Sequence, residues 1–152
     1  MEEKSKMSAW EIVETMMETD AFSKWLGIEL VVIEEGYAKI KLTVRDEMVN
    51  GFGIAHGGIS YSLADSALAF AGNSRGLVAV STNTAISHLV EVKPGDVLTA
   101  TTEEHNKGEK LAHYHVKVSN QNEENVAVFS GSIYRTTKVW KEKTEEEEET
   151  ES

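Results

Sequence analysis

Hydrophobic and polar residues alternate with a period of two along most of the chain, which predicts a protein built mainly from β-strands. The predicted strands cover residues 27–35, 37–45, 77–91, 97–106, 111–120 and 126–139. Short polar turns connect the last four strands, and no crossover helix lies between them. The sheet is therefore expected to be antiparallel.

Two segments depart from this alternation and predict helices. The first covers 8–20, with Ser8 as its N-cap residue and Glu11 as the capping-box partner. The second begins after Gly58 and is expected to end at Gly72, because glycine commonly terminates helices. Its positions are almost wholly apolar, so it should be buried on most sides. A curved antiparallel sheet wrapped around this one long central helix, an α+β architecture, fits the order of elements.

Length and composition indicate a single domain. The 152 residues are 40% hydrophobic, and one core suits that length. We expect the domain to cover 8–140, between a disordered N-terminus at 1–7 and a disordered acidic tail at 141–152. No apolar run is long enough to span a membrane and no signal peptide is apparent, so a cytoplasmic protein without a membrane partner is expected.

Charge and cysteine content exclude several functions. The formal net charge of −11 argues against nucleic acid as a partner, because phosphate contacts need clustered Lys and Arg. The absence of cysteine removes disulfides, thiolate metal ligands and Cys nucleophiles. His113 and His115 share one strand face, but no third ligand stands at a recognisable spacing. We therefore expect no metal.

A glycine-rich loop at 50–58 leads directly into the second predicted helix and carries the candidate chemistry. Its glycines let the backbone approach a ligand closely. The helix N-terminus presents N–H groups and a positive dipole end to negative charge on oxygen. Asp65 is the only charged residue of the helix, and a carboxylate there is unfavourable unless it is hydrogen-bonded or serves a site. The junction thus supplies an oxyanion binder and a candidate base or nucleophile.

Gly57 and Asp65 of one chain cannot contact the same carbonyl group. They are eight residues apart, which along a helix is about 12 Å. The Asp side chain leans toward the helix N-terminus but recovers only a small part of that distance. If both groups act together, Asp65 must come from a second copy whose helix lies antiparallel. The spacing therefore predicts a two-fold dimer with active sites at its interface.

Structural interpretations of the same residues remain open. Asp65 could be a satisfied buried carboxylate without chemistry. His56 could be a general base, although its place before two glycines suits a hydrogen bond that fixes the loop better. Asn50 could serve only to stabilise an Asn-Gly turn.

Three short motifs and one turn carry a family resemblance. The motifs are Asn50-Gly51, His56-Gly57-Gly58 and Ser62-Leu63-Ala64-Asp65-Ser66-Ala67, and the turn is Pro94-Gly95-Asp96 with the strand residues that follow it. On these residues the chain resembles the hotdog-fold acyl-CoA thioesterases, in particular the phenylacetate-degradation (PaaI-type) branch. The resemblance covers about 22–138.

The resemblance implies a role for each motif residue. Asp65 corresponds to the family's nucleophile or general base on the thioester carbonyl, contributed across the dimer. The Gly57 N–H is similar to the oxyanion donor, and Asn50 to the residue that orients the carbonyl or the attacking water. Ser66 sits where the family places a hydroxyl that positions water. His56 and Gly58 complete the site, and the family's dimers commonly pair into tetramers, so a homotetramer is expected.

The contacts to CoA are less clearly indicated. Relatives often carry a basic or proline-bearing segment just before the Pro-Gly-Asp turn, where this chain has Glu91. The basic residues left for the CoA phosphates are Lys93, Lys107, Lys110 and Arg135, with Arg75 at the end of the helix.

The implied function is hydrolysis of an aryl- or medium-chain acyl-CoA to the free acid and CoA, without a cofactor. The acyl pocket could be lined by Phe52, Tyr61, Phe70 and Met48, or these could be core residues. Two alternatives remain. One is a non-catalytic acyl-CoA binding or regulatory module. The other is an acyl-CoA hydratase or dehydratase, but those relatives place Asp before His in one motif, whereas here His56 precedes Asp65.

Overall fold

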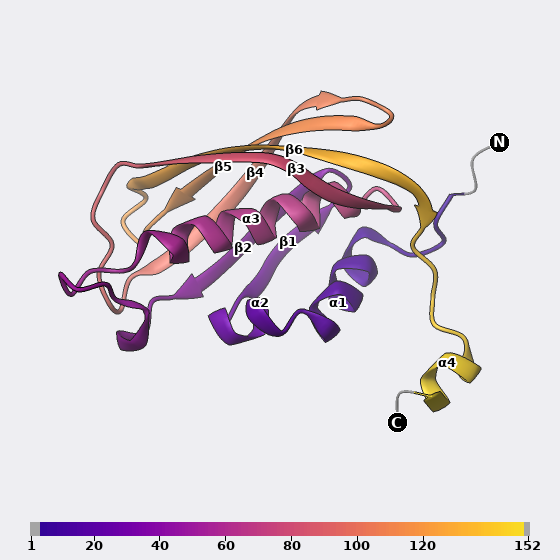
Figure 1. Cartoon of the computed structure of the whole chain (residues 1–152), viewed down its shortest axis with the longest axis horizontal. Coiled ribbons are helices and arrows are strands. Elements are labelled where there is room, and N and C mark those ends of the chain that lie inside the picture. The colour runs from indigo at the N-terminus through magenta and orange to yellow at the C-terminus, as the bar shows by residue number, and fades with distance from the viewer. Residues whose placement is uncertain (1–3, 151–152) are drawn as a thin grey trace.

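A six-stranded sheet curves around one long helix in the computed structural model, which describes residues 4–150 (Figure 1). The strands are β1 (Glu29–Glu34), β2 (Tyr37–Thr43), β3 (Leu77–His88), β4 (Val97–Lys107), β5 (Leu111–Ser119) and β6 (Asn125–Val139). Their order in the sheet is β1-β2-β4-β5-β6-β3, and every neighbouring pair is antiparallel. The predicted architecture, an antiparallel sheet around a central helix, is confirmed.

The alternating pattern places one face of each strand against the helix. In β5, Ala112, Tyr114, Val116 and Val118 are buried, while His115 and Lys117 between them are exposed. In β2 the same holds for Ala38, Ile40 and Leu42. Burial of these side chains is the main favourable term that holds the curved sheet onto the helix.

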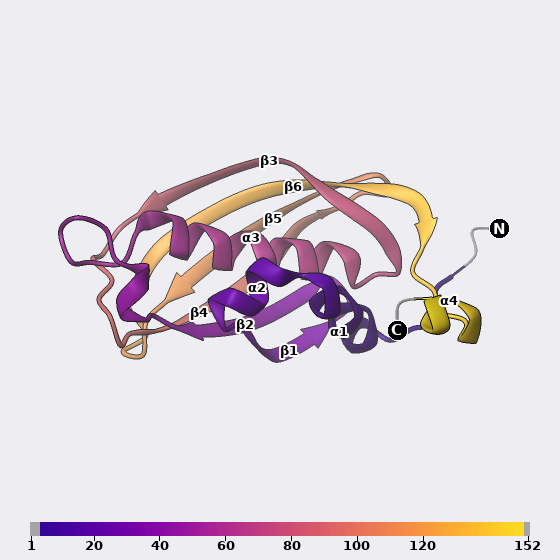
Figure 2. The ribbon, with the colours of Figure 1, turned by 60° about the horizontal axis from the view of Figure 1, so that its bottom comes forward.

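The central helix α3 (Gly57–Asn73) lies in the concave face of the sheet (Figure 2). The prediction that it ends at Gly72 is wrong. The helix continues to Asn73 and is capped by Ser74, and the left-handed turn is made by Gly76, with φ of +106°. A Cβ on Gly72 would lie 3.2 Å from Ile133 of β6, so this glycine serves close packing between helix and sheet.

Two short helices precede the sheet. The first, α1 (Ala9–Thr19), begins as predicted, since the Ser8 hydroxyl oxygen accepts from the Glu11 N–H at 3.1 Å. The second, α2 (Ala21–Leu26), was not predicted. It is capped by the Asp20 side chain and ends at Gly27, which has a left-handed φ of +76°. Both helices pack against α3.

The chain ends contain more structure than the composition indicates. The Ser5 hydroxyl donates to the Trp140 carbonyl at 2.5 Å, so part of the N-terminal segment lies beside the end of β6. The acidic tail contains the short helix α4 (Glu145–Thr150). The division into a domain at 8–140 and two disordered ends stays a prediction, and 1–3 and 151–152 lie outside the described residues. No helix within 4–150 is long and apolar enough to cross a membrane.

Candidate active site

The glycine-rich loop is held in place by its own hydrogen bonds. The Asn50 side-chain oxygen accepts from the Phe52 N–H at 2.9 Å, and the Asn50 carbonyl accepts from the Gly53 N–H at 3.1 Å. The side-chain oxygen of Asn50 therefore stabilises the turn, as one of the two interpretations of this residue predicted. Its amide nitrogen has no hydrogen-bond partner among the described residues. Two further bonds, from Ala55 to the Val92 carbonyl (2.7 Å) and from His56 to the Met48 carbonyl (2.8 Å), tie the loop to its neighbours.

The N-terminus of α3 presents a backbone donor that has no acceptor in the described part of the chain. The ring Nδ1 of His56 accepts from the Gly58 N–H at 2.9 Å and caps the helix. This contact fixes the loop, as the sequence favoured, and it occupies both the Nδ1 lone pair and the Gly58 donor. The Gly57 N–H, the first of the helix, has no acceptor within residues 4–150. Gly57 is therefore the backbone group available to a negatively charged oxygen.

Asp65 is a half-buried carboxylate without a partner among residues 4–150 of its own chain. Burial raises the pKa of Asp65 above its ordinary value, because no positive charge or donor compensates for the lost hydration. None of the described residues forms a hydrogen bond or ion pair with it. The interpretation of Asp65 as a satisfied buried carboxylate is thus not supported within the monomer. An unbroken helix from Gly57 keeps the two groups about 12 Å apart.

Ser66 has a hydrogen-bond partner within its own chain. Its hydroxyl lies 2.9 Å from the hydroxyl of Ser23 in α2, which donates in turn to Asp20 at 2.6 Å. That Ser66 positions water stays a prediction. Adjacent residues on a helix point about 100° apart, so Ser66 belongs to the packing of α2 against α3.

A hollow of about 420 Å³ lies at the N-terminus of α3. It is lined by Asn50, Ile54 and Ala55 from the loop, Gly57 and Ser60 from α3, and 88–92, which begin with the last residue of β3. The sequence placed 88–91 within the predicted strand 77–91 and considered Glu91 for its charge, but it did not place His88 beside the start of the helix. A larger hollow of about 580 Å³ lies between α1 and the tail, but five glutamates line it, which suits an anionic CoA poorly.

The predicted CoA-binding residues do not gather at this hollow. Lys93 does lie beside it, in the turn before β4, and is exposed. Lys107 and Lys110 flank the turn between the end of β4 and the start of β5, whereas the hollow is lined up to Val92, shortly before β4 begins. Within one chain these two lysines and the Gly57 donor therefore cannot contact the same small group.

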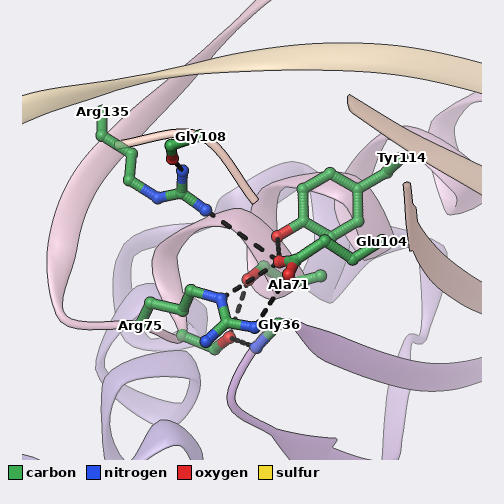
Figure 3. Close-up of polar contacts among 8 residues, drawn as sticks. Gly36, Ala71, Arg75, Glu104, Gly108, Tyr114 and Arg135 are labelled. Atoms are coloured by element: carbon green, nitrogen blue, oxygen red, sulfur yellow. Dashed lines mark hydrogen bonds and ion pairs between the residues drawn. The ribbon is translucent and has the colours of Figure 1, made fainter. Parts of the chain in front are cut away.

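Arg135 and Arg75 belong to a polar cluster at the C-terminal end of α3 (Figure 3). The Glu104 carboxylate accepts from Arg75 at 2.8 and 3.1 Å and from the Tyr114 hydroxyl at 2.5 Å. Arg135 is buried, donates to the Gly108 carbonyl and lies 4.0 Å from Glu104. The prediction that Arg135 contacts CoA is corrected, because its guanidinium is enclosed in the monomer.

The charge of this cluster is set by its contacts. Burial raises the pKa of Glu104, but hydrogen bonds from Arg75 and Tyr114 and the nearby arginine charges outweigh it, so the net shift is downward. The pKa of Tyr114 is raised, first by burial and then by its hydrogen bond to Glu104. Glu104 therefore stays ionised and Tyr114 neutral at pH 7, which is a stable, closed arrangement.

Comparison with known proteins identifies the family. The model of the family described as "Thioesterase superfamily" matches residues 52–127, which include Gly57, Asp65 and the helix between them. The chain belongs to the thioesterase superfamily. The acyl-coenzyme A thioesterase PaaI of Escherichia coli (strain K12) is 40% identical over 127 residues, which cover 84% of this chain and 91% of that protein.

Solved structures of similar proteins share the fold. The PaaI protein from the phenylacetic acid degradation operon of E. coli has a TM-score of 0.84 and 39% identity, covering 86% of this chain and 95% of its own. A hypothetical thioesterase of Streptococcus pneumoniae, solved with coenzyme A, has a TM-score of 0.77 and 26% identity, covering 83% and 98%. A Streptococcus mutans protein bound to acetyl CoA has a TM-score of 0.71 and 28% identity, covering 74% of this chain and 91% of its own.

These findings confirm three expectations from the sequence. The chain has the hotdog fold, it resembles the PaaI-type branch, and its reaction class is that of a thioester hydrolase.

Proposed function

We propose that this protein is an acyl-CoA thioesterase whose site combines the Gly57 N–H of one copy with Asp65 of a second copy. The observation that carries the proposal is a pair of unsatisfied groups on one helix. Gly57 has a free donor at the helix N-terminus, and Asp65 is half-buried without a partner within the described chain. A free N–H can bind an oxyanion, and a free carboxylate can accept a proton during the reaction.

The reaction uses each group once. The thioester carbonyl oxygen accepts from the Gly57 N–H, where one donor lowers the barrier by about 3 kcal/mol. Asp65 removes a proton from water as its oxygen attacks the carbonyl carbon. The C–S bond then breaks, the CoA sulfur leaves as thiolate or takes up the proton, and the free acid remains. Direct attack by the Asp65 carboxylate, followed by hydrolysis of the anhydride, uses the same geometry.

An exposed edge strand supports the shared site. β3 forms one edge of the sheet, and its residues 80–83 are exposed (Figure 2). A free edge of 12 residues presents unpaired N–H and C=O groups to another strand. Antiparallel pairing of β3 with its copy creates a two-fold axis and sets the two α3 helices antiparallel, the arrangement that the distance between Gly57 and Asp65 requires. Further pairing into a tetramer, and a cytoplasmic location, stay predictions.

The substrate is proposed from the relatives and the hollow. A related protein is named an acyl-CoA thioesterase, and two others were solved with CoA or acetyl CoA. Leu89 and Val90 line one side of the hollow, and both side chains are apolar and exposed. Met48 and Phe70 are core residues, 2% and 1% exposed, so they do not select the acyl group. We propose an aryl or medium-chain acyl group, with Lys93 facing the CoA phosphates.

Thiol release from acyl-CoAs tests this function. Phenylacetyl-, hydroxybenzoyl- and medium-chain acyl-CoAs are offered to the wild type, to Asp65→Asn and to the control Asp46→Asn, an exposed carboxylate near the loop. We expect Asp65→Asn to lower kcat by about 10²–10⁴-fold and Asp46→Asn to leave it unchanged. Binding without thiol release by the wild type supports the non-catalytic module instead. An Asp65→Asn protein that keeps most of its activity contradicts the assignment of Asp65.

A further inference from the structure

His88, the last residue of β3, lies against Gly57 at the start of α3. A Cβ built on Gly57 would lie 3.0 Å from His88 Nε2 and 3.2 Å from Cε1. The imidazole thus occupies the space that a side chain at position 57 would need. Gly57 does not have a left-handed φ, so its backbone does not require glycine. The small residue at 57 leaves room for the ring of His88.

The ring nitrogens of His88 are free in the described chain. Two other histidines engage a ring nitrogen in a hydrogen bond. His56 Nδ1 accepts from the Gly58 N–H, and His113 Nδ1 lies 2.9 Å from the Ser132 hydroxyl. His88 has no hydrogen bond or ion pair with any residue of 4–150, and it lines the hollow with Gly57 and Asn50. It lies on the same face of β3 as Ile86, which packs against the core.

Its Nε2 lies within reach of an oxygen held by Gly57. A Cβ lies about 1.5 Å from Cα, so Nε2 is within about 4.5 Å of the Gly57 Cα. An oxygen that accepts from the Gly57 N–H is within about 4.4 Å of the same Cα, from the N–Cα bond and an N···O distance of about 2.9 Å. The two atoms thus lie near the same Cα, and the exposed His88 side chain has room to turn its ring toward that oxygen.

The Gly57 N–H is a single donor, and a second hydrogen bond would stabilise the negative charge on the carbonyl oxygen further. The next backbone donor of the helix, the Gly58 N–H, is already bonded to His56. We propose that His88 Nε2–H is the second donor to the carbonyl oxygen that the Gly57 N–H binds. The inference rests on the proposed thioesterase function and adds a residue that contacts the reacting oxygen. No proton is transferred by His88 in this step; it donates a hydrogen bond to the charge that develops as water attacks.

Two substitutions distinguish the effect of the hydrogen-bond donor of His88 from the effect of its aromatic ring. His88→Phe keeps an aromatic ring against Gly57 but removes both nitrogens. His88→Gln places an amide N–H₂ close to the position of Nε2. His105→Phe is the control, because His105 is an exposed histidine on the outer face of β4. Steady-state thiol release gives kcat and KM for all three variants and the wild type.

We expect His88→Phe to lower kcat by about 10–100-fold with KM within about twofold, since the lost bond strengthens in the transition state. His88→Gln should recover most of that loss, and His105→Phe should behave as the wild type. The inference is overturned by a His88→Phe enzyme with wild-type kcat, or by a His88→Gln enzyme as slow as His88→Phe. In either case an inactive Asp65→Asn variant leaves the proposed function standing. A wild type that releases no thiol overturns both.

Discussion

Replacing Glu104 with Gln should destabilise the fold strongly, because this one carboxylate neutralises two arginines at the end of α3. The Glu104 side chain is 14% exposed, and those of Arg75 and Arg135 are 22% and 6% exposed. Gln keeps the size of Glu but lacks the charge. Arg135, whose Nη2 is buried without a hydrogen bond, then loses its nearest counter-charge, 4.0 Å away.

The expected magnitude follows from these contacts. Removing one partner of a buried ion pair costs about 3–5 kcal/mol, and Arg75 retains some solvent, so we expect a loss of about 2–4 kcal/mol. For a chain of this length that lowers Tm by about 5–15 °C. The effect also depends on pH. Since folding lowers the pKa of Glu104, its contribution is present above the ordinary carboxyl pKa and disappears as pH falls through the folded value.

Urea unfolding at pH 7 and at acidic pH measures this difference, at one fixed protein concentration because association also stabilises. Glu103→Gln is the matched control. Glu103 is 75% exposed and its contact to His105 is 3.5 Å, so its replacement should change stability by less than about 0.5 kcal/mol. A Glu104→Gln protein as stable as Glu103→Gln at pH 7, or a gap between them that widens in acid, refutes the reasoning.

Two further predictions concern the site. Because burial raises the pKa of Asp65 and its ionised form is the base, kcat should rise with pH through a pKa above the ordinary carboxyl range and then level off, and Asp65→Asn should lack that rise. A flat wild-type profile contradicts the role of Asp65. Because the Ser66 hydroxyl contacts Ser23, Ser66→Ala should keep kcat within about threefold and lower stability by about 1 kcal/mol, measured by thiol release and urea unfolding. A loss of more than about 30-fold in kcat would show that Ser66 takes part in the chemistry.

The sequence predicted the sheet well because period-two alternation reports directly which side chains face the core. The helix α2 was missed because its six residues are too few to display a helical period, although Asp20 and Gly27 mark its two ends. The end of α3 was misplaced because Gly72 looks like a cap but serves contact with Ile133. Local patterns thus fail where tertiary packing decides a residue's role.

The same limit applies to the site. Gly57 and Asp65 could be singled out as candidates because a carboxylate and a glycine loop on an apolar helix are visible without coordinates. Arg135 was misassigned from its charge, although the alternation of Phe129, Gly131 and Ile133 places it on the buried face of β6. His88 could not be found, because its contact with Gly57 joins residues from distant parts of the chain.

The central claim is that each site takes Gly57 from one copy and Asp65 from another, and mixed oligomers test it most directly. Gly57→Pro removes the N–H, and proline is well tolerated at the first position of a helix. Its ring also displaces the exposed His88 side chain of the same copy, which disables the Gly57 side of that site and leaves Asp65 of that chain unchanged. His56 already has φ of −59° and ψ of 136°, a conformation that suits a residue before proline. Gly57→Pro and Asp65→Asn chains are each expected to be inactive alone.

Co-expressed in equal amounts, the two chains should regain activity. Half of the dimers are then mixed, and each mixed dimer has one intact site of two, so about a quarter of the wild-type thiol release is expected. That recovery requires Gly57 and Asp65 to act from different copies. Co-expressed chains that release no more thiol than either variant alone would contradict the shared site.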